Sequence, residues 1–370
     1  MPKSHVLRFN PSKFQENILG WYHQNQRALP WRVVGRDKTD PYKVWMSEIM
    51  LQQTTVPAVI PYFLKFTEQW PTVVDLADAD DAEVMAAWAG LGYYARARNL
   101  LKCARVVARE LNGKFPKDLD GLLELPGVGP YTAAAIMAIA YGQPATVVDG
   151  NIERITSRIF AIEDAYPEGK KIVHQNAHRL FEKIEVWEQQ DIKAYPQALM
   201  DIGAGICTPK NPSCGLCPVQ RFCKAFAEGQ AEAYPVKAAK KAVPIRHGDV
   251  YWITDGKGNI IVEKRPDNRM LGGMVGLPTS DWDINKGKRS ENSLNLQEIL
   301  QSPLKIGKIY HVFTHFRLEL AVWVVAMPDL KKLLKYSPDL MIVNTHMVEL
   351  NKIGLPTLFL KAARLAHKNV

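Results

Sequence analysis

Four cysteines crowded into one short segment constrain this chain more than any other feature of its sequence. They are Cys207, Cys214, Cys217 and Cys223, with the spacing C-x6-C-x2-C-x5-C. Thiolates are soft ligands that suit zinc or an iron–sulfur cluster, and four on one loop can surround a single metal centre. Structural zinc sites usually pair cysteines in short C-x2-4-C units, which this spacing fits only partly, so both metals stay open. The fifth cysteine, Cys103, lies among apolar residues of a predicted helix, where we expect it to fill the core.

Length, composition and charge indicate an intracellular two-domain protein with a polyanionic partner. A chain of 370 residues exceeds one ordinary compact domain, and 47% hydrophobic residues are enough for real cores. The net charge of +9 favours a polyanion, although anionic membrane surfaces also attract lysine and arginine. No apolar run has the length of a signal peptide core or a membrane span, so we expect a soluble cytoplasmic protein, associated with the nucleoid if bacterial. Its cysteines would then be reduced rather than paired in disulfides.

The hydrophobic pattern changes from helical to alternating about two thirds of the way along the chain. The helical spacing of apolar residues predicts helices at 11–27, 43–53, 56–69, 81–89 and 94–112. The later part predicts strand pairs within 249–266 and 309–327, helices at 295–302 and 356–367, and a polar loop at 281–294. We therefore expect an all-α domain over residues 1–230, a basic linker over 231–245 and a smaller α+β domain over 246–370.

Glu48 is a carboxylate on a predicted helix that is otherwise mostly apolar. It lies in the run VWMSEIML, with Trp45 and Met46 before it and Ile49 and Met50 after it. Burial in such company disfavours the charged form and raises the pKa, which suits a general acid near neutral pH. The alternative, a helical glutamate facing solvent, is less attractive because apolar residues flank it on nearly every side.

A second carboxylate, Asp149, stands just before a predicted helix over Ile152–Ile159. Local sequence favours a helix N-cap for it, and a catalytic role is compatible with capping. Upstream, LPGVGPYT places Gly127 and Gly129 between two helical stretches, where glycines allow a tight turn that exposes N–H groups to a phosphate. A simple tight turn would explain these glycines equally well.

Three stretches together resemble the helix–hairpin–helix DNA glycosylases of the endonuclease III superfamily. The cysteine run within 197–223 resembles their [4Fe–4S] loop, LPGVGPYT resembles their DNA-binding hairpin, and WMSEIMLQQT resembles the MutY-type adenine glycosylases in particular. The resemblance implies a mainly α helix–hairpin–helix glycosylase domain with one [4Fe–4S] cluster on the four cysteines, plus a smaller α+β Nudix-like domain. Gly127 and Gly129 would then contact the DNA backbone.

For catalysis, the resemblance implies that Glu48 protonates N7 of a flipped-out adenine. Asp149 would stabilise the oxocarbenium-like state, electrostatically or by brief covalent attachment. Tyr131 stands where the lyases of this superfamily carry a nucleophilic lysine, so base removal without strand cleavage is expected. Tyr131 and Asn151 would line the reacting nucleotide.

The same resemblance implies contacts to the adenine and to the base opposite. The matching positions are Trp31, Arg32, Gln53, Thr54, Leu91, Tyr93, Gln197 and Thr314. Gln197 would hydrogen-bond the adenine edge, and Tyr93 would act as a wedge in the base stack. Lys210 and Arg221 are either phosphate contacts or solvated charges. The implied partner is double-stranded DNA with an A:8-oxoguanine or A:G mispair, bound by a monomer.

The region 246–370 resembles the Nudix-like domain of MutY-type enzymes, with two departures. Val275 replaces a tryptophan, and no carboxylate-rich run R-E-x-x-E-E follows Gly273, so we expect no magnesium-dependent diphosphate hydrolysis. VFTHF at 312–316 resembles a Phe-Ser-His loop that touches 8-oxoguanine, with Thr314 in place of the serine. An ordinary strand with aromatic residues would also explain this pattern.

Two rival functions remain at this point. One is a pyrimidine glycosylase and lyase like endonuclease III, and the other is a catalytically silent DNA-binding protein. Tyr131 in place of an amine argues against the first, and the two retained carboxylates, Glu48 and Asp149, argue against the second.

Overall fold

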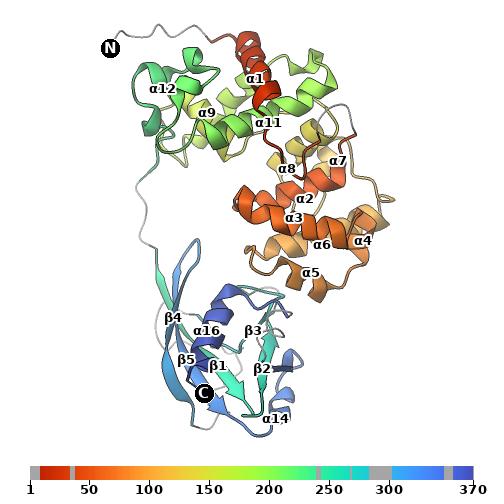
Figure 1. Cartoon of the computed structure of the whole chain (residues 1–370), viewed down its shortest axis with the longest axis vertical. Helices are drawn as coiled ribbons and strands as arrows, with labels where there is room; N and C mark the ends of the chain where they lie inside the picture. The colour runs from red at the N-terminus through yellow and green to blue at the C-terminus, as the bar shows by residue number, and fades with distance from the viewer. Residues whose placement is uncertain are drawn as a thin grey trace. The chain divides into compact units, whose positions relative to one another are not determined.

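The computed structural model describes residues 9–33, 38–238, 243–266, 269–282, 302–345 and 353–369. The chain forms two compact units (Figure 1). The first comprises residues 1–77 and 102–240 and is helical, and the second comprises residues 78–101 and 241–370 and contains a β-sheet.

The first unit is built of helices. They are α1 (Pro11–Asn25), α2 (Pro41–Leu51), α3 (Val56–Gln69), α4 (Val73–Asp78), α7 (Leu119–Leu123), α8 (Pro130–Ala135), α9 (Gly150–Phe160), α10 (Lys170–Leu180), α11 (Gln189–Gly205) and α12 (Lys224–Ala227). A π-helical turn, Ile136–Ala140, continues α8, and short 3-10 turns lie at Ile184–Val186, Cys214–Leu216, Gln220–Phe222 and Ala231–Ala233. Helices α1, α9 and α11 pack together (Figure 1).

The first helices begin where a polar cap precedes a proline. The Asn10 side chain accepts a hydrogen bond from Lys13 N before α1, and Asp40 accepts one from Tyr42 N before α2. Pro11 and Pro41 follow these caps at the first helical position, where a missing N–H costs nothing. Helix α2 starts two residues before the predicted bound of 43 and ends two before 53, because Gln53 has a φ of +57° that no α-helix accommodates.

The second unit contains α5 (Asp81–Trp88), the first part of α6 (Ala95–Arg109) and a six-stranded sheet. The strands are β1 (Ile245–Thr254), β2 (Asn259–Lys264), β3 (Val275–Gly276), β4 (Leu304–Val312), β5 (Arg317–Ala326) and β6 (Leu340–Asn344). Their order is β3-β2-β1-β5-β4, with β6 also pairing with β2. Strands β1 and β5 are parallel, and the other pairs are antiparallel.

Both faces of this sheet are covered. Successive side chains of a strand point to opposite faces, so Val250 and Trp252 of β1 join one apolar cluster while Tyr251 and Ile253 join another. Helix α16 (Thr357–His367) covers the first face (Figure 1), and α14 (Lys331–Leu334) contributes to the second cluster.

The predicted strand pairs and the C-terminal helix are confirmed. β1 and β2 turn through Asp255-Gly256, β4 and β5 lie in the second predicted pair, and α16 begins one residue after the predicted bound of 356. The predicted helix at 295–302 lies, apart from Ser302, outside the described residues, as does most of the loop at 281–294. Among the described residues, no helix combines the length and apolarity needed to cross a membrane.

Candidate active site

A cavity of the helical unit gathers most of the predicted site residues. Its walls come from the chain before α2, from α2 itself, from the α7–α8 hairpin, from the start of α9 and from the middle of α11. Eleven of the predicted residues line it: Trp31, Arg32, Glu48, Gln53, Thr54, Gly127, Gly129, Tyr131, Asp149, Asn151 and Gln197. These residues span more than 160 positions of the sequence, so the fold itself assembles the cavity.

Glu48 lies on α2 and is 5% exposed. Burial raises the pKa of its carboxyl group to about 7; a hydrogen bond from Tyr131 lowers it, and the negative charge of Asp149 raises it. The Tyr131 hydroxyl donates this hydrogen bond to Glu48 Oε2 over 2.5 Å. A carboxyl group with this pKa is partly protonated at neutral pH and can therefore donate a proton into the cavity.

The hairpin between α7 and α8 places Tyr131 at the second position of α8. Gly127 has a φ of +77°, a conformation that a residue with a Cβ rarely adopts, and it turns the chain. Gly129 caps α8, followed by Pro130 at the first helical position. Burial and the charge of Glu48 raise the pKa of Tyr131 well above 10, so its hydroxyl stays protonated and acts as a donor.

Asp149 both caps a helix and faces the cavity. Its Oδ1 accepts a hydrogen bond from Ile152 N at 2.7 Å, which confirms the predicted N-cap of α9. Its Oδ2 accepts one from Asn151 Nδ2 at 2.8 Å. Burial raises the pKa of Asp149, while these hydrogen bonds and the charge of Arg154 oppose the rise. Asp149 therefore has the donors that stabilise an anion, whereas Glu48 has a single side-chain donor.

Asn151 is held by contacts that sequence reasoning missed. Arg154 donates to Asn151 Oδ1 at 2.9 Å, to Gly203 O at 2.7 Å and to Cys207 O at 2.7 Å. A Cβ added at Gly203 would lie 2.5 Å from Asn151 Cβ, so only glycine allows α9 and α11 to approach this closely. The glycine-rich end of α11, DIGAG, was the available signal. These contacts connect Asp149, through Asn151, with the start of the cysteine loop.

Arg32 lies in the cavity wall, but its guanidinium group is engaged. It donates two hydrogen bonds to Asp201, of 2.6 and 2.7 Å, and Arg27 Nε donates a third at 2.6 Å. Burial raises the pKa of Asp201, but Arg32 and Arg27 outweigh this, and the pKa lies below its usual value. Asp201, which sequence reasoning missed, thus fixes the segment that carries Arg32 and Trp31.

Three further predicted contacts occupy different parts of the cavity. Trp31 packs edge-to-face on Phe63, with ring centroids 5.3 Å apart. Gln197 lies on α11 and donates from Nε2 to Lys193 O at 2.9 Å. Gln53 follows α2 in a left-handed conformation beside Thr54. This backbone strain is of the kind that persists at binding sites because the surrounding structure enforces it.

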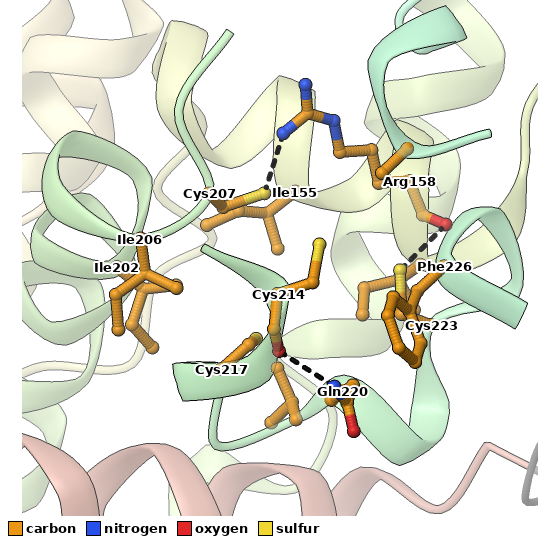
Figure 2. A pocket seen from close by; sticks show the side chains of 13 residues that line it. Ile155, Arg158, Ile202, Ile206, Cys207, Cys214, Cys217, Gln220, Cys223 and Phe226 are labelled. Atoms are coloured by element: carbon orange, nitrogen blue, oxygen red, sulfur yellow. Dashed lines mark hydrogen bonds between the residues drawn. The ribbon is translucent and has the colours of Figure 1, made fainter. Parts of the chain in front are cut away.

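The four clustered cysteines surround a second cavity of the helical unit (Figure 2). Arg158, 2% exposed, donates from Nη1 to Cys207 Sγ at 3.2 Å, and its carbonyl oxygen accepts from Cys223 Sγ at 3.4 Å. Gln220 Nε2 donates to Cys214 O at 2.9 Å. Arginine and backbone groups therefore fix the thiols around an apolar space.

This arrangement fits a cluster better than a single ion. Burial raises the pKa of Cys217 to about 12 and that of Cys223 to about 11, so thiolates form here only with positively charged metal beside them. The four thiols line one cavity, and such an arrangement suits a cofactor of several atoms.

Comparisons with known proteins agree with this geometry. The family model described as the HhH-GPD superfamily base excision DNA repair protein matches residues 46–183, the iron–sulfur binding domain of endonuclease III matches 207–223, and the NUDIX domain matches 249–365. The adenine DNA glycosylase of Buchnera aphidicola subsp. Schizaphis graminum is 36% identical over 317 residues, which cover 83% of this chain and 86% of that protein. The chain belongs to the adenine DNA glycosylase family.

Two further relatives support this assignment. The human adenine DNA glycosylase is 32% identical over 370 residues, covering 85% of this chain and 67% of the human protein. The solved structure of a thermostable thymine-DNA glycosylase matches with a TM-score of 0.50 and 30% identity, over 59% of this chain and 97% of that one. The predictions of a helix–hairpin–helix glycosylase fold, a Nudix-like α+β region and a [4Fe–4S] cluster are thereby confirmed. This adenine DNA glycosylase family member is a hydrolase of N-glycosyl bonds with a [4Fe–4S] cluster, and the cavity lined by Cys207, Cys214, Cys217 and Cys223 fits that cluster.

The remaining predicted site residues of this glycosylase lie in the sheet-containing unit. Tyr93, 46% exposed, and Thr314, in the turn between β4 and β5, are 221 positions apart in sequence. Their hydroxyl groups are nevertheless 3.2 Å apart and share a hydrogen bond. Leu91 is buried, and its carbonyl accepts a hydrogen bond from Arg96. Val275 lies on the short strand β3, and the lack of magnesium-dependent hydrolase activity stays a prediction.

Proposed function

We propose that this glycosylase hydrolyses the N-glycosidic bond of adenine mispaired with 8-oxoguanine or guanine, without cutting the strand. The observation that carries the proposal is the pair of unlike carboxyl groups in one cavity. Glu48 is buried with a pKa of about 7, and Asp149 accepts hydrogen bonds from Asn151 and Ile152. One group is thus suited to give a proton and the other to remain an anion.

The reaction begins when adenine leaves the base stack and enters the cavity, a step that is easiest at a mispair. Glu48 transfers its proton to N7 of the adenine. The bond from C1′ to N9 then breaks with its electron pair going to the base, and the Asp149 carboxylate stabilises the positive charge on the sugar. Water adds to C1′ and loses a proton, which leaves an abasic site.

Tyr131 and Asn151 act beside these two carboxyl groups. Tyr131 donates to Glu48 and carries no amine, so it forms no imine with the abasic sugar. Asn151 orients Asp149 through its 2.8 Å hydrogen bond. Base removal is therefore the end of the reaction, and the backbone stays intact.

Recognition is shared among the other predicted residues. In this proposal the adenine pocket is lined by Trp31, Arg32 and Gln197. Backbone phosphate is bound at Gly127 and Gly129. The opposite base is contacted by Gln53, Thr54, Leu91, Tyr93 and Thr314. Residues 1–230 form the glycosylase domain, 231–245 a linker, and 246–370 the domain that reads the lesion. The enzyme binds double-stranded DNA as a monomer.

The test is single-turnover incubation of the cluster-containing protein with duplexes that carry adenine opposite 8-oxoguanine, guanine, cytosine or thymine. We expect free adenine from the first two duplexes and an intact backbone until alkali is added. Efficient covalent trapping by borohydride, or release of damaged pyrimidines in place of adenine, would contradict the proposal.

A further inference from the structure

The turn between α5 and α6 has a strained backbone that ends on an exposed tyrosine. Gly90, Gly92 and Tyr93 have φ angles of +99°, +77° and +50°. Two of them are glycines, for which this conformation is inexpensive, but Tyr93 has a Cβ and adopts it only if the surroundings hold it. The aromatic ring that would wedge into DNA is thus attached to a backbone that needs support.

Arg96, one turn further on α6, supplies that support. Its guanidinium group lies 5.2 Å from the Trp88 ring centroid and 5.4 Å from that of Tyr93. It donates to Gly92 O at 3.2 Å and to Leu91 O at 3.4 Å. The planar guanidinium group can stack on aromatic faces while its N–H groups bind carbonyl oxygens, which a lysine ammonium group does less well.

Other hydrogen bonds hold the same turn. Trp88 Nε1 donates to Gly92 O at 2.9 Å, and Arg96 N donates to Tyr93 O at 2.8 Å. Arg96 is 8% exposed, and burial lowers its pKa to about 10, so it stays charged at neutral pH. Burying a charged group is unfavourable unless hydrogen bonds or other charges stabilise it. The position of the Arg96 guanidinium group under an exposed turn therefore indicates a role beyond packing.

We infer that Arg96 is a positioning residue for Tyr93, which fixes the turn in the conformation that presents the tyrosine to a mispair. This inference rests on the proposed role of Tyr93 in reading DNA. Arg96 acts through Tyr93, because its described contacts hold the Tyr93 ring and the carbonyl groups of the turn, and it does not line the cavity around Glu48. It therefore governs affinity for mispaired DNA and leaves the rate of bond cleavage in bound DNA unchanged.

The experiment combines Arg96→Met with Tyr93→Ala in the full chain with its cluster. Affinity is measured with a duplex that carries a non-hydrolysable adenine analogue opposite 8-oxoguanine, and the single-turnover rate is measured at saturating substrate duplex. We expect Arg96→Met to weaken binding about tenfold in the parent, with the saturated rate within about twofold, and to change binding less than about twofold in Tyr93→Ala. Equal losses in both backgrounds would overturn the inference, because Arg96 would then act independently of Tyr93.

A second pair of variants protects the test against a folding defect in Arg96→Met. Gly92→Ala strains the same turn while keeping Arg96, since an added Cβ meets nothing within 4 Å. Gly256→Ala is the matched control, because its φ of +72° and open surroundings are alike and it lies in the β1–β2 turn. We expect weaker mispair binding only for Gly92→Ala, and parent-like binding by Gly92→Ala would count against the inference. A parent protein that releases no adenine would instead sink the proposed function.

Discussion

The cavity around Glu48 and the Tyr93–Thr314 contact use polar side chains in opposite ways. Glu48 is almost fully buried and has a pKa of about 7, and it receives a 2.5 Å hydrogen bond from Tyr131. Tyr93 and Thr314 are exposed, and their hydroxyl groups share a hydrogen bond of 3.2 Å. Burial raises the pKa of a carboxyl group, so that it can act as an acid near neutral pH. Exposed hydroxyl groups can instead exchange one hydrogen-bond partner for another with little change in free energy. We therefore expect losses of orders of magnitude in the cavity and of only severalfold at the contact.

The largest effect is expected for Glu48→Gln. The amide fills the same space but cannot donate a proton to the leaving base, so single-turnover adenine release should fall by about 10³-fold or more. Glu68→Gln is the control, an exposed glutamate on α3. Adenine release by Glu48→Gln at the parent rate would show that the acid is another group.

Asp149→Asn should follow, with a loss of about 10² to 10³-fold, because the amide cannot balance positive charge on the sugar. Its oxygen can still accept from Ile152 N, so the cap of α9 survives. The charge of Asp149 also raises the pKa of Glu48, so this pKa should be lower in Asp149→Asn. The residual activity should therefore decline with rising pH at a lower pH than the activity of the parent does. Asp118→Asn, at the N-cap of α7, controls for capping alone. Equal activity losses in the two variants would show that Asp149 acts only as a helix cap.

Local features of this chain could be predicted from its sequence, whereas contacts between distant residues could not. Helix caps, apolar periodicity and the cysteine spacing are local patterns, so they predicted α1, α3 and the cap at Asp149 within a few residues. Partners distant in sequence carry no such pattern. Arg32 matched a motif, but its bidentate pairing with Asp201, 169 positions away, depends on how α11 packs. The contact between Tyr93 and Thr314 could not be predicted for the same reason, because the two residues are 221 positions apart.

Tyr131→Phe tests the hydrogen bond in the cavity by its effect on pH dependence. That hydrogen bond stabilises the ionised Glu48 and lowers its pKa, so its removal should raise the pKa above about 7. Because the proposed mechanism uses the protonated acid, the alkaline limb of the single-turnover rate should move to higher pH. Tyr141→Phe is the control, since its hydroxyl donates to Phe115 O in the same unit. A limb that stays in place or moves to lower pH would exclude this coupling.

The smallest effects are expected for Tyr93→Phe and Thr314→Val, each of which removes one exposed hydroxyl group. A neutral hydrogen bond contributes about 0.5–1.5 kcal/mol net, so each variant should lower the preference for 8-oxoguanine over guanine by roughly two- to tenfold. If the two hydroxyl groups act as one unit, the double variant should lose little more than either single variant. Thr345→Val, whose hydroxyl donates to Gly258 O, is the matched control. Fully additive losses would mean that each hydroxyl group meets DNA alone, and the 3.2 Å contact would then describe only the DNA-free protein.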